Sequence, residues 1–190
     1  MTSDPFALIE SAESIDDLDV KRAALMAAIK LLATKCNKSA EDSYALGYAW
    51  YLMPDDTKER EVETLRHLTE AVHLQPKHSY ARLYLAHFYF DTSKYALALP
   101  TLTDFNTDEF TAHGQDWRDV KVAELILCCV LELRDEARIA GAVQELLVRA
   151  NRVDASAIPA PAELRKVLQA LVRANASKAR RSKRSLDGMK

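Results

Sequence analysis

Apolar residues recur every three or four positions along almost the whole chain of 190 residues. Between residues 15 and 36, for example, Leu18, Leu25, Ile29 and Leu32 follow this spacing, which places them on one face of a helix. The alternation of apolar and polar residues that is typical of a half-buried strand is almost absent. Because glycine and proline are also scarce, at four and six residues, we predict an all-α fold.

Capping and turn residues divide this pattern into separate helices. Asp4 precedes one helix start, and Ser39 followed by Asp42 resembles a capping box. Pro100 predicts a kink or an early end in its helix, and residues 106–115 are expected to be a loop. The short turns predict about nine helices, mostly in antiparallel pairs. The predicted helices are residues 5–12, 15–36, 40–53, 58–75, 79–90, 94–105, 117–133, 136–150 and 162–174.

Two segments of the sequence align with each other. In the first, Leu46-Gly47 is followed by Trp50 and later by Leu68, Ala71 and Pro76; in the second, Leu85-Ala86 is followed by Tyr89, Ala98, Leu102 and Phe105. This order of small and large residues resembles the tetratricopeptide repeat, a helix–turn–helix unit of about 34 residues. The resemblance covers residues 40–105 and, more weakly, 116–151. The turn near residues 53–60 is longer than in that family.

The resemblance implies a short right-handed α-solenoid of helix pairs. Its ends need caps, because a repeat cannot bury its own outer face. The expected organisation is an N-terminal helical cap at 1–38, a repeat region at 39–151, a linker with a C-terminal capping helix at 152–177, and a disordered basic tail at 178–190.

In this family the first helix of each repeat lines a concave face that binds partner proteins. The resemblance therefore implies that two stripes of residues, spaced by three and four, face a groove, while Trp50, Leu85 and Tyr89 point into the stack. Tyrosine suits such a face because it combines a large apolar ring with a polar tip. The alternative is that the N-terminal helix pair covers the stripe. The predicted partner-binding residues are Tyr44, Tyr48, Tyr51, Tyr80, Leu83, His87 and Phe90.

Catalytic and metal-binding motifs are not found in the sequence. There is no GxSxG, HExxH or P-loop pattern, and four glycines cannot form a phosphate cradle. His113 lies near Asp108, Glu109 and Asp116, but without the spacing of a metal site. Three cysteines, two of them adjacent, do not make a disulfide framework. We predict a non-enzymatic protein without cofactor or metal.

Charge divides the chain into an acidic body and a basic tail. Residues 178–190 carry six lysine and arginine residues against Asp187, a net charge of +5, whereas residues 1–177 carry −7. We expect a protein–protein interaction module acting in the cytoplasm, with no membrane segment and an open oligomeric state. Two alternatives remain: an immunity protein that neutralises a bacterial toxin, and an adaptor that binds nucleic acid through the tail.

Overall fold

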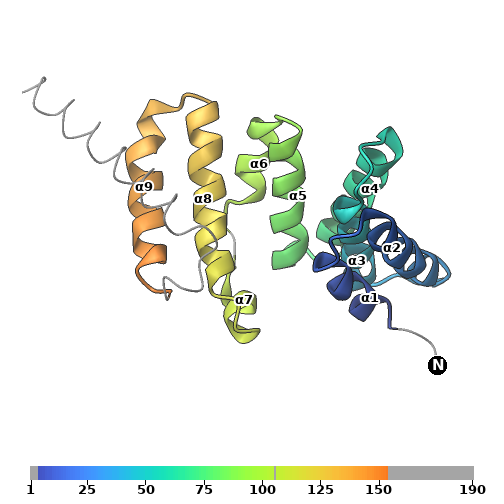
Figure 1. Cartoon of the computed structure of the whole chain (residues 1–190). Helices are drawn as coiled ribbons and strands as arrows, with labels where there is room; N and C mark the ends of the chain where they lie inside the picture. Colours follow the sequence, from blue (N-terminus) through green and yellow to red (C-terminus); the bar gives the residue numbers. More distant parts are fainter. Residues whose placement is uncertain (1–3, 105, 154–190) are drawn as a thin grey trace, which may run out of the picture. The chain divides into compact units, whose positions relative to one another are not determined.

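The computed structural model describes residues 4–104 and 106–153. All regular secondary structure in these ranges is α-helical, which confirms the all-α prediction. The chain forms two compact units, residues 1–109 and 110–190. No helix in the described ranges is long and apolar enough to cross a membrane. In chain order (Figure 1), the helices are α1 (Pro5–Glu13), α2 (Leu18–Ala33), α3 (Ala40–Leu52), α4 (Lys58–Leu74), α5 (Ser79–Asp91), α6 (Tyr95–Thr101), α7 (Asp108–Ala112), α8 (Trp117–Glu132) and α9 (Glu136–Ala150).

The described residues contain nine helices. Eight of them correspond to predicted helices, and the other, α7, was not predicted. The predicted helix at 162–174, most of the linker and the tail at 178–190 lie outside these residues. The loop prediction for 106–115 was wrong in part, because α7 forms within it. The Asn106 side chain accepts a hydrogen bond from the Asp108 amide (2.9 Å), and Phe110 is fully buried. This local capping and burial explain the additional helical turn.

The helix starts follow the capping residues. Asp4 accepts a hydrogen bond from the Phe6 amide (3.1 Å). Ser39 Oγ accepts from the Asp42 amide (3.1 Å), while Asp42 Oδ2 accepts from the Ser39 amide (3.0 Å), which completes the predicted capping box. Helix α2 begins at Leu18, later than predicted, because Asp17 is its N-cap.

Pro100 ends α6 early, as predicted, since the last helical residue is Thr101. Arg82 of α5 then binds the carbonyl groups beyond this end. Its Nε donates to the Thr101 oxygen (2.9 Å) and its Nη1 to the Asp104 oxygen (3.2 Å), and Nη2 donates to the Thr103 oxygen. A basic side chain thereby satisfies acceptors that the broken helix leaves open.

The long turn between α3 and α4 is held by arginines from two helices. Arg22 of α2 donates from Nε and Nη2 to the two carboxylate oxygens of Asp55, each at 2.6 Å. This paired contact also lowers the pKa of Asp55. Arg60 of α4 donates to the Met53 carbonyl (3.3 Å). The extra length of the turn therefore serves as an attachment point for α2.

In the first unit, each helix packs on the next. Helix α1 contacts α2, α2 contacts α3, α3 contacts α4, α4 contacts α5, and α5 contacts α6. Helix α3 also contacts α1 and α5, so it is the central helix of this unit. The core around it contains the buried residues Ile9, Ala12, Leu25, Ala28, Ile29, Leu32, Ala45, Leu46, Tyr48, Ala49, Met53, Leu68, Tyr84 and Leu85.

Gly47 allows α3 and α4 to approach closely. A Cβ atom built at Gly47 would lie 2.7 Å from Leu68 Cγ and 2.9 Å from the Leu68 backbone nitrogen. Both distances are shorter than the contacts that real Cβ atoms make, and the backbone of α4 cannot rotate out of the way as a flexible side chain would. Any larger residue at position 47 must therefore push the two helices apart.

In the second unit, α8 and α9 pack together across a tight turn. Arg134, in the turn, has a φ of 54°, the left-handed conformation that commonly ends helices. Arg149 Nη1 of α9 donates to Asp119 Oδ1 of α8 at 2.5 Å, and both side chains are largely buried. The turn at residues 134–135 was predicted from the sequence.

We predict that Gly47→Ala lowers the free energy of unfolding by about 1–2 kcal/mol, because overpacking outweighs the higher helix propensity of alanine. Gly141→Ala is the matched control. Gly141 is also helical, but a Cβ atom there meets nothing within 4 Å. It should raise the free energy of unfolding by about 0.5–1 kcal/mol. Urea denaturation followed by circular dichroism measures both; a Gly47→Ala protein as stable as wild type would contradict the close-approach interpretation.

Candidate functional site

Helices α3 and α5 bring a group of aromatic side chains together. Tyr48 and Tyr84 are at its centre, with ring centroids 4.1 Å apart. On α3 the contributing positions are spaced by four and three residues, and the same spacing holds on α5, so each helix contributes one face. We call this group the tyrosine patch; its members are Tyr44, Tyr48, Tyr51, Tyr80, Tyr84 and His87.

The patch has a buried floor and a partly exposed outer layer. Tyr48 and Tyr84 are only 7% and 9% exposed. The Tyr84 hydroxyl donates to the Tyr48 hydroxyl (3.1 Å), which donates to Glu13 of α1 (2.8 Å). The other four members, Tyr44, Tyr51, Tyr80 and His87, are partly exposed. A hydrogen-bonded floor of this kind fixes the rings above it in position.

The structure shows which part of the stripe is covered by the N-terminal helices. Helix α1 covers Tyr48, since Ile9 and Ala12 belong to the same core cluster and Glu13 accepts a hydrogen bond from the Tyr48 hydroxyl. The outer tyrosines keep part of their surface in solvent. Helix α1 thus covers the floor at Tyr48, whereas Tyr44, Tyr51, Tyr80 and His87 are partly exposed.

Burial raises the pKa values of two phenols in the patch. Burial, with the adjacent Tyr84 and Glu13, raises the pKa of Tyr48 well above the ordinary value for tyrosine. Burial and the hydrogen bond to Asp91 raise the pKa of Tyr51 in the same direction, although Arg60 opposes this. These phenols are therefore hydrogen-bonding groups in neutral form rather than phenolates.

The structure places the predicted site residues in three different settings. Tyr44, Tyr48, Tyr51, Tyr80 and His87 come together in the patch. Two predicted members lie elsewhere. Leu83 is 1% exposed, within the core, and Phe90 packs against Tyr95 with ring centroids 5.2 Å apart.

Tyr84 is not among the predicted binding residues, but it lies at the centre of the patch. Residues 83 and 84 follow Tyr80 by three and four positions. Both spacings place a residue on the same helical face as Tyr80, so spacing alone could not choose between Leu83 and Tyr84. In the structure, the fourth residue after Tyr80, which is Tyr84, belongs to the patch. A chemical signal favoured the same choice, because a tyrosine needs a partner for its hydroxyl when buried and Tyr48 supplies one.

Sequence reasoning missed His78 as a capping residue. It is the N-cap of α5 and only 1% exposed, and its Nδ1 accepts from the Ala81 amide (3.5 Å). Its Nε2 lies 3.0 Å from Glu41 Oε2, and its ring centroid lies 5.0 Å from that of Tyr44. His78 therefore connects the start of α5 to the patch and to a carboxylate on α3.

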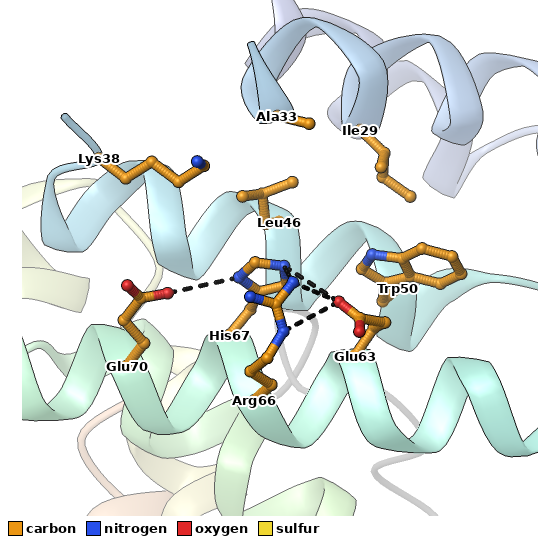
Figure 2. Close-up of a pocket in the computed structure, with 9 residues that line it drawn as sticks. All are labelled: Ile29, Ala33, Lys38, Leu46, Trp50, Glu63, Arg66, His67 and Glu70. Atoms are coloured by element: carbon orange, nitrogen blue, oxygen red, sulfur yellow. Dashed lines mark hydrogen bonds and ion pairs between the residues drawn. The ribbon is translucent and has the colours of Figure 1, made fainter. Parts of the chain in front are cut away.

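Apart from the patch, a recess lies between α2, α3 and α4, with a volume of about 330 Å³ (Figure 2). Its apolar wall includes Trp50, which is partly buried rather than fully inside the stack, while Leu85 is buried as predicted. His67 lies at its base and is 4% exposed. The lining residues are Ile29, Ala33, Lys38, Leu46, Trp50, Glu63, Arg66, His67 and Glu70.

The neighbours of His67 determine its tautomer. Arg66 Nη2 lies 2.8 Å from His67 Nε2. Because a guanidinium group only donates, Nε2 must accept and the ring proton must be on Nδ1, which lies 3.5 Å from Glu70 Oε2. Glu63 binds Arg66 from the preceding turn at 2.5 Å. Burial, with the nearby Arg66 charge, lowers the pKa of His67 and keeps its ring neutral.

The remaining chemistry-bearing residues form no cluster. Among residues 4–104 and 106–153, no three His, Cys, Asp or Glu side chains are placed to hold a metal ion. Cys36, Cys128 and Cys129 are free thiols. Burial raises the pKa of Cys128 and raises that of Cys129 to about 11, so these two thiols are held in their less reactive protonated form.

Comparison with protein-family models and with curated proteins finds no match for this sequence. The site is therefore interpreted from its own geometry.

We predict that His67 makes the protein less stable in mild acid. Its pKa is lower in the folded state than the unfolded value of about 6.5, so the unfolded chain binds the proton more readily. The free energy of unfolding should therefore fall as the pH drops below about 6.5 and level off below the folded pKa. His67→Gln removes the titration and should weaken this dependence.

His73→Gln is the control, because His73 is exposed on the same helix. Urea denaturation at several pH values between about 7.5 and 5 compares the two variants with wild type. Equal pH dependence in His67→Gln and His73→Gln proteins would contradict the role given to His67.

Proposed function

We propose that this chain is a non-catalytic protein–protein interaction module that holds a segment of a partner protein against the tyrosine patch. The observation that carries the proposal is the construction of the patch: three partly exposed tyrosine rings, Tyr44, Tyr51 and Tyr80, lie around a hydrogen-bonded floor. Rigid aromatic anchors of this kind are enriched in protein interfaces, because they bury large areas at a low entropic cost.

The order of helix packing in the first unit supports a repeat-like arrangement. Alternate helices α1, α3 and α5 contact in sequence, and α2 and α4 each pack on the following helix. This is the order that a stack of helix pairs requires. We propose that the pairs are antiparallel and form a short tetratricopeptide-like solenoid whose first helices carry the binding face, and that the protein acts in the cytoplasm.

One partly exposed ring of the patch is also held in a fixed orientation, which favours binding. Tyr51 Oη donates to Asp91 (2.8 Å), so its ring is held in one orientation before a partner arrives. Such preorganisation reduces the entropy lost on binding. Because Tyr48 and Tyr84 are buried, substituting them would disturb the core; the outer tyrosines are the appropriate residues for a test.

We expect the double variant Tyr44→Ala/Tyr80→Ala to lose at least about tenfold in affinity for partner proteins, since truncating interface tyrosines commonly costs more than about 1 kcal/mol each. Quantitative affinity capture with the full chain as bait measures this. Tyr95→Ala is the control, because Tyr95 is partly buried and contacts Phe90 rather than the patch.

Circular dichroism should show that both variant proteins are folded. If the Tyr44→Ala/Tyr80→Ala protein is folded and captures the same partners as wild type with equal strength, the patch is not the binding site.

A further inference from the structure

Two carboxylates contact the tyrosine patch directly, and a third contacts His78, which packs against the patch. Glu13 accepts from the Tyr48 hydroxyl and Asp91 accepts from the Tyr51 hydroxyl, each at 2.8 Å. Glu41 lies 3.0 Å from His78, whose ring packs on Tyr44. They come from three helices, α1, α3 and α5, so the acidic groups lie at separate points around the aromatic surface.

These carboxylates retain capacity for a ligand. All three residues are exposed, and the Glu41 side chain is 55% exposed. Each contact described above uses one oxygen of its carboxylate: Oε1 of Glu13, Oδ2 of Asp91 and Oε2 of Glu41. A carboxylate accepts up to about four hydrogen bonds, so each can bind a further donor.

The charge of the first unit has the same sign as the edge of the patch. Residues 1–109 contain 11 lysine and arginine residues against 18 aspartate and glutamate residues, a net charge of −7. Arg60 is a cation that acts on Tyr51, and its guanidinium binds the Met53 carbonyl and the Asp56 carboxylate. The long-range field therefore favours an approaching cation.

We propose that the partner segment is rich in arginine or lysine, and that its cationic groups lie on the partly exposed rings of Tyr44, Tyr51 and Tyr80 while donating hydrogen bonds to Glu13, Glu41 and Asp91. This inference rests on the proposed function, because it uses the same patch. A cation over a tyrosine face is attracted by the ring quadrupole. Adjacent carboxylates add charge-assisted hydrogen bonds, which are stronger than neutral ones.

The same geometry disfavours other segments. An apolar segment would desolvate the carboxylates without pairing them, which is costly. An acidic segment would face like charges at three points of the edge. A cationic segment satisfies both the aromatic faces and the carboxylates.

Fluorescence anisotropy tests the proposal with two labelled peptides: one with four arginines separated by glycine and serine, and one in which citrulline replaces each arginine. Citrulline keeps the shape and removes the charge. We expect the full chain to bind the arginine peptide at least about tenfold more tightly at low salt. Equal binding of the two peptides would overturn the proposal.

A pair of charge-matched variants separates the patch from the general field. Glu41→Gln/Asp91→Asn removes two charges at the patch, and Glu59→Gln/Glu61→Gln removes two exposed charges from the first turn of α4. The first should weaken binding of the arginine peptide by about tenfold and the second by less than about twofold. Equal losses in both proteins would also overturn the proposal.

Failure of this inference is distinguishable from failure of the proposed function. If Tyr44→Ala/Tyr80→Ala abolishes partner capture while Glu41→Gln/Asp91→Asn leaves it unchanged, the patch binds a partner but not through cations.

The chain's own basic segment is a second source of arginine. It is tested in the full chain by replacing Arg180, Arg181, Lys183 and Arg184 with glutamine. If the arginine peptide binds only after these replacements, the patch is occupied by the chain itself and the assignment to a partner protein is overturned. If the replacements leave binding of the peptide unchanged, the assignment to a partner is supported.

Discussion

The contact between Gly47 and Leu68 is the constraint on which the rest of the first unit depends. It sets the separation of α3 and α4 to one at which a Cβ atom on residue 47 would lie 2.7 Å from Leu68 Cγ, so that a larger residue forces a shift. Because α3 also contacts α1, α2 and α5, its position determines where each of these helices packs. The tyrosines of α3 meet those of α5 only if this central helix keeps its place, so the geometry of the patch follows from a single missing side chain.

The patch itself is ordered by a chain of hydrogen bonds across three helices. Tyr84 of α5 donates to Tyr48 of α3, which donates to Glu13 of α1. A buried hydroxyl group without a hydrogen-bond partner destabilises the fold. Here each tyrosine hydroxyl donates a hydrogen bond to the next group in the series. This arrangement explains how a surface so rich in tyrosine is compatible with a stable core: its inner members are buried and hydrogen-bonded, and its outer members are partly exposed.

Much of this architecture was predictable because it depends on local rules. The capping box at Ser39, the early end of α6 at Pro100 and the tyrosine stripe of α3 all follow from neighbouring residues. The small residue at position 47 was expected from the resemblance to a repeat. Local rules could not choose between Leu83 and Tyr84, because both positions share a helical face with Tyr80.

Long-range partners could not be predicted from the sequence. Glu13 and Asp91 are 35 and 40 residues from the tyrosines that they bind, and nothing in their local sequence indicates these contacts. Helix α7 was missed because it depends on burial of Phe110 rather than on a recognisable period. The acidic edge of the patch, on which the proposed preference for a cationic segment rests, is therefore a property of the fold alone.

Site-specific photo-crosslinking in living cells tests most directly whether the tyrosine patch is the binding face. A photoreactive benzoylphenylalanine replaces Tyr80 in one protein and Tyr95 in another, since Tyr80 is in the patch and Tyr95 is outside it. If a partner segment lies on the patch, the protein modified at position 80 forms a specific crosslinked product and the protein modified at position 95 does not. Crosslinking from position 95 with none from position 80 would contradict a binding face built by α3 and α5.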